Sequence, residues 1–267
     1  MTQLAERSDA LALDTSPEGF TLTWQQRLIL RHSSDRPCLW MGAGVADIAM
    51  FRGNFSIKDK LHEKIALPDV AVSNTADGWR LHFSRGSTLT ATLHIAIDEQ
   101  GRLKLDLQNG DPSHNRIWLR LAASPDDHIY GCGEQFSCFD LRGKPFPLWS
   151  SEQGVGRNKK SYVTWQADCL ENAGGDYYWT FFPQPTFVST QKYYCHVENS
   201  CYMNFDFSAP TYHELALWEG NATLRIECAT SWIALLEKLT ALLGRQPALP
   251  DWIYDGVILG IQGGTEV

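Results

Sequence analysis

Short segments of alternating apolar and polar residues recur along most of this chain, with turn residues about every eight to twelve positions. Successive side chains of a β-strand point to opposite faces, so this alternation indicates half-buried strands. Many short strands at such spacing are typical of an antiparallel sandwich. The sequence therefore predicts a mainly β fold built as an antiparallel β-sandwich.

The predicted strands form two groups, on either side of an irregular stretch from Asp126 to Pro185. The first group comprises Phe20–Leu30 with a partner near Cys38–Met41, a meander of Trp79–Ser84, Leu89–Ile97 and Leu103–Leu107, and then Ile117–Leu121. The second group comprises Thr186–Thr190, Tyr193–Val197, Tyr202–Phe207, His213–Trp218 and Leu224–Cys228. Within the meander, Gly101 supplies the positive φ that a short hairpin needs.

The end of the chain has a different pattern. Ser231–Leu243 has helical apolar spacing, with Ser231 as N-cap and Gly244 after the last turn. A proline-punctuated linker leads to Trp252–Gly264, whose apolar centre predicts a strand buried on both faces. A barrel of strand–helix units needs about 250 residues, so we expect the front part of a longer protein. The predicted domains are a sandwich over residues 1–244 and a linker with a barrel entry over 245–267.

Composition and charge exclude several classes of protein. The net charge of −8 and the lack of a long basic run argue against a nucleic-acid partner, and no segment is apolar enough for a membrane span. Seven scattered cysteines without metal-ligand spacing predict reduced thiols, a cytoplasmic location and no metal. A homo-oligomer is compatible with the sequence. The glycines at Gly131 and Gly133 fail as a phosphate cradle, because Phe136 stands where a third glycine belongs.

The irregular stretch from Tyr130 to Asp176 is the best candidate for a functional segment. It combines hydrogen-bonding side chains with flat rings, a mixture suited to a polyol, and such long stretches in compact proteins are often functional. An ordinary loop packed by its own aromatic rings fits the pattern equally well. Spacing in the sequence does not reveal which carboxylates pair in space, so no catalytic acid or nucleophile is assigned here.

Three motifs resemble glycoside hydrolase family 31, in the order in which that family carries them. Ile129-Tyr-Gly-Cys-Gly-Glu is similar to its Tyr-Gly-x-Gly-Glu segment, and Pro185-Thr-Phe-Val-Ser-Thr to its Pro-Phe-Phe-x-Ser strand. Leu243-Gly-Arg-Gln-Pro-Ala-Leu-Pro-Asp-Trp resembles the connection into its barrel. Within the family, Trp149-Ser-Ser-Glu-Gln-Gly-Val-Gly-Arg and Thr164-Trp-Gln-Ala-Asp resemble the bacterial sulfoquinovosidases.

The resemblance covers nearly the whole chain, and it implies a fold and an activity. The fold is a galactose-mutarotase-like β-sandwich followed by the first strand of a (β/α)₈ barrel. The activity is retaining hydrolysis of α-sulfoquinovosides, such as sulfoquinovosyl glycerol, to sulfoquinovose, without a cofactor. The departures at Thr186 and Tyr194 favour this specialised branch over enzymes that act on starch-type substrates.

The resemblance places both catalytic aspartates, and the residues that hold the sulfonate, on later barrel strands. We therefore expect no catalytic residue in this sequence and no turnover by it alone. Candidate substrate-binding residues are Gln262, at the end of the predicted barrel strand, and Glu134, Gln135 and Arg157 on the irregular stretch. The alternatives are an α-glucosidase or α-xylosidase of the same family, a non-catalytic carbohydrate-binding sandwich, and a scaffold protein.

Overall fold

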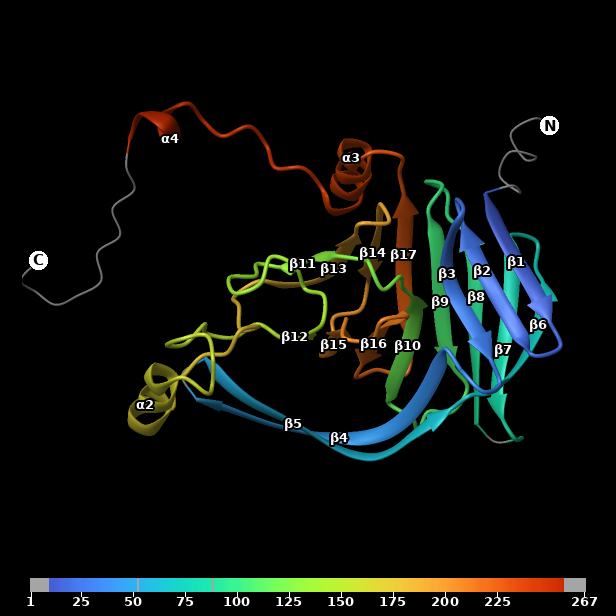
Figure 1. The fold of residues 1–267 in the computed structure, drawn as a ribbon, viewed down its shortest axis with the longest axis horizontal. Coiled ribbons are helices and arrows are strands. Elements are labelled where there is room, and N and C mark those ends of the chain that lie inside the picture. The colour runs from blue at the N-terminus through green and yellow to red at the C-terminus, as the bar shows by residue number, and fades with distance from the viewer. Residues whose placement is uncertain (1–9, 52, 88, 257–267) are drawn as a thin grey trace, which may run out of the picture.

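The computed structural model describes residues 10–51, 53–87 and 89–256, which build three β-sheets (Figure 1). All pairings between named strands are antiparallel. The mainly β, antiparallel architecture predicted from the alternation is confirmed.

The smallest sheet contains three strands in the order β1-β2-β3, namely β1 (Leu11–Ser16), β2 (Gly19–Trp24) and β3 (Arg27–Ser33). The prediction of one strand over Phe20–Leu30 is wrong, because the chain reverses at Gln25 and Gln26, whose φ angles are 47° and 66°. Two positive φ angles are typical of a tight hairpin, usually signalled by Asn or Gly. The predicted pairing with Cys38–Met41 is also wrong, since β3 pairs with β2.

The second sheet has six strands in the order β12-β15-β16-β10-β4-β5. Their bounds are β4 (Leu39–Phe51), β5 (Asn54–Ala66), β10 (Arg116–Ala122), β12 (Pro145–Leu148), β15 (Met203–Asp206) and β16 (Tyr212–Leu217). The predictions for β10, β15 and β16 are confirmed to within two residues at each end. The long β4–β5 hairpin was not predicted beyond the start of β4.

The third sheet has eight strands in the order β11-β13-β14-β17-β9-β8-β7-β6. Their bounds are β6 (Asp69–Asn74), β7 (Gly78–Arg85), β8 (Leu89–Ile97), β9 (Leu103–Asn109), β11 (Ile129–Gly133), β13 (Pro183–Ser189), β14 (Tyr193–Val197) and β17 (Ala222–Cys228). The predicted meander is confirmed as β7, β8 and β9, and Gly101 turns with a φ of 84°.

The two larger sheets pack face to face around one apolar core. Phe187 of β13 meets Phe205 of β15 and the adjacent Phe207, with ring centroids 6.1 and 5.3 Å apart and the rings edge to face. All three side chains are fully buried. Contacts between rings from the two sheets are those of a β-sandwich, in which the inner faces interdigitate.

The β4–β5 hairpin extends beyond the sandwich as a curved arm (Figure 1). At the base of the arm, Arg116 Nη2 lies 3.1 Å from Asp59 Oδ1. At its tip, Glu152 N donates to Gly53 O over 2.9 Å, and Phe55 packs on Trp149 with centroids 5.7 Å apart. The arm therefore joins the six-stranded sheet to the irregular segment between β11 and β13.

Three helices occur in the described residues, α2 (Tyr162–Glu171), α3 (Trp232–Leu243) and α4 (Trp252–Asp255). The prediction of α3 is confirmed, with Ser231 accepting from Ala234 N as N-cap. Helix α2 was not predicted, and it lies within the stretch interpreted as irregular. The side chain of Ser161 caps α2, while Tyr162, Val163, Trp165, Cys169 and Leu170 are exposed. An exposed helix needs no amphipathic pattern, and α2 shows none.

The chain after α3 continues through residues 245–251 to the single helical turn α4. We predicted that a buried strand begins at Trp252, whereas Trp252–Asp255 is helical. The apolar centre of that predicted strand, and the candidate site residue Gln262, lie outside the described residues. The described helices include none that is both long and apolar enough for a membrane span.

Candidate functional site

The segment from Glu134 to Phe182 leaves the eight-stranded sheet after β11 and returns to it at β13, and it carries three of the four predicted site residues. Its departure point is the Tyr130-Gly-Cys-Gly-Glu motif. Cys132 has a φ of 58°, and both flanking glycines also have positive φ. Cys132 is fully buried, and the strand register shifts between Gly131 and Gly133. This bulge turns the chain out of the sheet.

Gly133 shows why the motif needs glycine. Its φ is 83°, and a Cβ at this position would lie 2.1 Å from Phe182 O. That close approach allows Glu134 N to donate to Phe182 O over 2.9 Å. The start and the end of the segment are thus held together, which fixes Glu134 beside Thr180 and Phe182.

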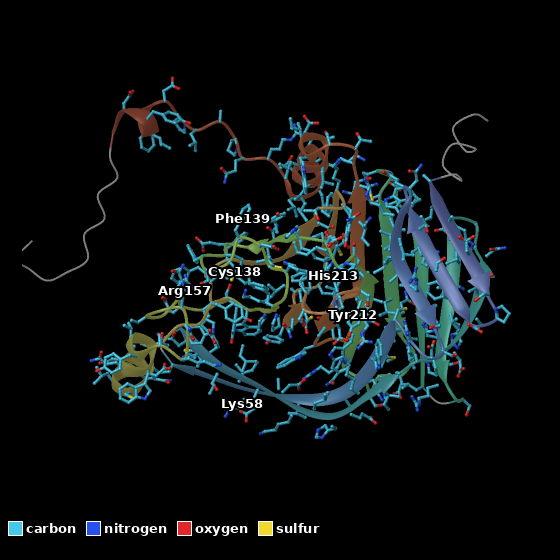
Figure 2. The ribbon with its side chains drawn as sticks, viewed as in Figure 1. Lys58, Cys138, Phe139, Arg157, Tyr212 and His213 are labelled. Carbon is cyan, nitrogen blue, oxygen red and sulfur yellow. The ribbon has the colours of Figure 1, made fainter. Side chains whose placement is uncertain are left out.

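Arg157 is held in place by the segment itself. Its Nη1 donates to Trp179 O over 2.6 Å, and its Nη2 donates to Gln153 Oε1 over 3.2 Å. The guanidinium carbon lies 4.6 Å from the ring centroid of Phe136, a cation–π distance. Arg157, which Figure 2 labels, therefore links Phe136 near the start of the segment to Trp179 near its end.

Lys159 holds Trp179 from another side. Its Nζ lies 4.7 Å from the ring centroid of Trp179 and 3.0 Å from Asp168 Oδ2. It also donates to Gly174 O over 2.6 Å. One cation thus orients an aromatic ring, a carboxylate and the end of the turn after α2.

The predicted site residues Glu134 and Gln135 have different hydrogen-bond partners. Glu134 is exposed, and one of its carboxylate oxygens accepts from Thr180 Oγ1 over 3.3 Å. Gln135 is half-buried, and its Nε2 donates to Cys132 O over 3.0 Å. The structure therefore brings Glu134 and Arg157 to the same stretch, Trp179–Thr180, while the amide of Gln135 turns back onto the motif.

The side chains of this segment are suited to binding polyols and less suited to general acid–base catalysis. Burial raises the pKa of Tyr177 to about 12, and burial also raises the pKa of Tyr178, so both remain neutral phenols. The half-buried ring of Trp179 and the exposed carboxylate of Glu134 offer a flat apolar face and a hydrogen-bond acceptor. Within the described residues, no cluster of three or more His, Cys, Asp or Glu side chains is placed to hold a metal ion.

Comparison with protein families decides the class of protein. Residues 52–206 match the glycosyl hydrolase 31 N-terminal galactose mutarotase-like domain. The chain belongs to glycosyl hydrolase family 31. The family and the galactose-mutarotase-like sandwich implied by the three motifs are confirmed, whereas the barrel entry stays a prediction. The site segment, from Glu134 to Phe182, lies wholly inside the matched residues.

The similar proteins include two curated relatives. The sulfoquinovosidase of Escherichia coli K12 is 80% identical over 250 residues, and that of Agrobacterium fabrum C58 is 40% identical over 259 residues. Each match covers 94% of this chain and 37% of the relative's length. Among solved structures, a family 31 sulfoquinovosidase from E. rectale, in complex with the aza-sugar inhibitor IFGSQ, has 46% identity and a TM-score of 0.85. That match covers 96% of this chain and 38% of the solved chain.

Several residues that shape the site were not predicted from the sequence. Phe136 and Lys159 are the ring and the cation that accompany Arg157 and Trp179, and Thr180 is the donor to Glu134. Their contacts join positions 20 to 46 residues apart. Contacts between residues so far apart in the sequence cannot be predicted from their spacing, because the backbone of an irregular segment has no repeating geometry.

Proposed function

We propose that this chain is the N-terminal part of a retaining α-glycosidase that hydrolyses α-sulfoquinovosides, such as sulfoquinovosyl glycerol, to sulfoquinovose. The observation that carries the proposal is the 80% identity to the E. coli sulfoquinovosidase along 94% of this chain. The match to the E. rectale sulfoquinovosidase supports the same substrate class, because the two sequences are 46% identical over 96% of this chain. The chain spans 37% of the length of its curated relatives.

The proposed reaction needs two carboxyl groups about 5 Å apart, one as nucleophile and one as acid and then base. We assign neither role to a residue of this chain, and we expect both from a barrel that follows the linker at residues 245–251. The role of this chain is to present the segment from Glu134 to Phe182 at the substrate. Glu134 and Gln135 are the proposed contacts, and Arg157 is proposed to line the same side while its Nη atoms hold the segment's shape.

We also propose a cytoplasmic location. All seven cysteines are unpaired thiols in the described residues, and four of them are buried. Unpaired thiols persist in a reducing compartment, whereas secreted proteins usually oxidise them.

The test of the proposed reaction is to extend the reading frame past Val267 and assay the product on 4-nitrophenyl α-sulfoquinovoside beside 4-nitrophenyl α-glucoside. We expect cleavage of the sulfonated substrate and little of the glucoside, while the 267-residue chain alone cleaves neither. Faster cleavage of the glucoside makes the protein an α-glucosidase and contradicts the proposed substrate. A stop codon directly after Val267, with sugar binding by the chain alone, favours a binding module instead.

The role of Glu134 is tested in a chimera in which this chain replaces the matching region of the E. coli sulfoquinovosidase. We expect Glu134→Gln to raise KM several-fold while kcat and thermal stability stay unchanged. Glu99, an exposed glutamate in the β8–β9 turn, gives the matched control. An equal KM for Glu134→Gln, Glu99→Gln and the unsubstituted chimera contradicts a substrate contact by Glu134.

A further inference from the structure

A cleft of about 750 Å³ lies at the ends of several strands, away from the segment described above. It is bordered by the β2–β3 turn, by the connection from β3 to β4 and by the loop after β10. Small-molecule sites have volumes of roughly 300 to 1,000 Å³, so the cleft has room for a sugar. Its lining residues all lie outside the segment from Glu134 to Phe182 and play no part in the proposed reaction.

The cleft is positively charged in an acidic protein. Four arginines and two aspartates line it, whereas the whole chain has a formal net charge of −8. The lining residues that carry this charge are Arg27, Arg31, Arg36, Arg120, Asp35 and Asp127. Such a local reversal of sign attracts anions.

Two of the arginines have no carboxylate partner among the described residues. Arg27 donates to the carbonyl oxygens of Gln25, Gln191 and Ala229, so its position is fixed but its charge is not neutralised. Arg31 is exposed on β3. A guanidinium binds phosphate and sulfonate oxygens through two parallel hydrogen bonds, which makes these side chains suitable oxyanion ligands.

One wall of the cleft is a fixed stack of rings around a cation. The guanidinium carbon of Arg120 lies 3.7 Å from the ring centroid of Trp40 and 4.2 Å from that of Tyr212. Its Nε donates to Glu214 Oε2 over 2.8 Å, which anchors the stack to β16. Both rings are half-buried and line the cleft, and since Arg120 covers one face of each ring, the opposite face is the one that can meet a ligand. Flat rings of this kind pack against sugars.

An unsatisfied hydroxyl is the second, independent sign of a ligand. Tyr193 lines the cleft and is 4% exposed, and its hydroxyl lies near Ser189 but makes no hydrogen bond of normal geometry among the described residues. A buried hydroxyl without a partner costs a folded protein about 1 to 3 kcal/mol. Native proteins keep few such groups, and each one calls for an explanation by water or by a ligand.

We propose that this cleft binds an anionic sugar, that is, a hexose-sized polyol carrying a phosphate or sulfonate group. Arg31 and Arg27 receive the oxyanion, Trp40 and Tyr212 border the sugar ring, and the Tyr193 hydroxyl donates to it. This site goes beyond the proposed hydrolysis and does not rest on it, because every group named belongs to the cleft itself.

The test is isothermal titration of the 267-residue protein with glucose 6-phosphate, sulfoquinovose, glucose and inorganic phosphate. We expect binding of the first two ligands, weakening as salt is raised, and at least tenfold weaker binding of glucose and of inorganic phosphate. Whichever of the two anionic sugars binds more tightly identifies the oxyanion. Absence of binding by both at millimolar concentration overturns the proposal, as does equal binding of glucose. Equal binding of inorganic phosphate shows an adventitious ion only.

Two variants distinguish specific binding in the cleft from general attraction of anions to a charged surface. Arg31→Gln is expected to weaken binding of the anionic sugars at least tenfold, whereas Arg80→Gln, at an exposed arginine on β7 outside the cleft, leaves it unchanged. Tyr193→Phe is expected to weaken binding while the unliganded protein unfolds at the same or a higher temperature, because the unsatisfied hydroxyl is gone. Equal affinities for all variants overturn the proposal. Because binding is measured without turnover, this result is independent of the test of hydrolysis.

Discussion

His213 Nε2 lies 3.5 Å from Asp127 Oδ2, and both side chains are completely buried. The carboxylate also accepts hydrogen bonds from Ser189 Oγ at 2.7 Å and from Thr190 Oγ1 at 2.7 Å. His213 is on β16 of one large sheet, and Ser189 is on β13 of the other. Figure 2 labels His213 beside Tyr212, its neighbour on the opposite face of β16. A single carboxylate therefore joins the two sheets through the sandwich core.

Removing this carboxylate is expected to destabilise the sandwich. Asp127→Ala leaves the buried Ser189 hydroxyl without its acceptor, and each unsatisfied buried group costs about 1 to 3 kcal/mol. We expect the free energy of unfolding, measured with urea, to fall by about 2 to 4 kcal/mol. The control is Asp126→Ala at the exposed neighbouring position, which we expect to change it by less than about 0.5 kcal/mol. Equal values for the two variants contradict the bridging role.

The same pair predicts how stability depends on pH. Burial lowers the pKa of His213 below its ordinary 6.5, an effect that Asp127 only partly offsets. Below about pH 6.5 the unfolded chain therefore binds a proton that the folded chain excludes, so stability falls as the pH falls towards 5. Burial likewise lowers the pKa values of His32 and His196, and both act in the same direction.

The measurement is urea unfolding at pH 7.5, 6.5 and 5.5. We expect a steady loss of stability across this range, and a shallower loss in His213→Asn, which cannot titrate. Titration of Asp127 does not change the stability between pH 7.5 and pH 5.5. Burial raises its pKa, but the nearby His213 and the hydrogen bonds from Ser189 and Thr190 outweigh burial and lower it below 3.8, so its contribution is lost only in stronger acid. A wild-type slope equal to that of His213→Asn would exclude this histidine as a cause.

The ion pair between Arg116 and Asp59 anchors the curved arm at its base. Arg116 is 4% exposed and contacts Asp59 through both Nε and Nη2, so Asp59→Ala leaves a buried charge without its partner. We expect amide hydrogen exchange in the β4–β5 arm to become at least tenfold faster. The matched control is Asp47→Ala, because the Asp47–Lys60 pair is largely exposed and such pairs contribute little. Equal exchange in both variants contradicts the assignment of Arg116 as the anchor.

The family motif predicts a steric effect at Gly133. Gly133→Ala combines a positive φ with a Cβ 2.1 Å from Phe182 O, whereas Gly143→Ala has a φ of 82° and open space around its Cβ. Gly143→Ala therefore measures only the cost of a positive φ at a residue other than glycine, about 1 kcal/mol in the free energy of unfolding. We expect Gly133→Ala to lower the free energy of unfolding by at least about 3 kcal/mol or to prevent folding, because its Cβ clashes with a backbone oxygen. Thermal unfolding of both variants checks this, and similar melting temperatures disprove it.

Strands were predictable wherever burial imposes alternation. β8 reads Leu-Thr-Ala-Thr-Leu-His-Ile-Ala-Ile, and its buried positions follow the apolar residues closely. The arm escaped prediction because the outer parts of β4 and β5 are exposed on both faces, so no periodic burial constrains their sequence. The turn at Gln25 and Gln26 escaped because its residues are not those that usually adopt positive φ.

The sequence predicted which segment carries the site, but not how the side chains of that segment are arranged. Its mixture of rings and hydrogen-bonding groups and its family motif are visible in the sequence. The partners of its side chains are largely backbone oxygens, such as Trp179 O for Arg157 and Cys132 O for Gln135. Every residue carries a backbone oxygen, so residue types cannot reveal which one a side chain reaches. The helix α2 was missed for a related reason, since its exposed side chains follow no apolar stripe.

The hydrogen bonds and the ring contact of Arg157 all lie within one segment. Removing its side chain deletes the bonds to Trp179 O and to Gln153 and the stacking on Phe136. We expect Arg157→Ala to speed limited proteolysis within residues 150–182 about tenfold or more while the melting temperature of the sandwich changes little. Arg157→Lys should not restore protection, because an ammonium lacks the planar fork that spans two acceptors. Lys160→Ala, at an exposed neighbouring cation, is the control, and we expect wild-type cleavage there. Wild-type cleavage of Arg157→Ala would mean that the segment keeps its shape without this guanidinium.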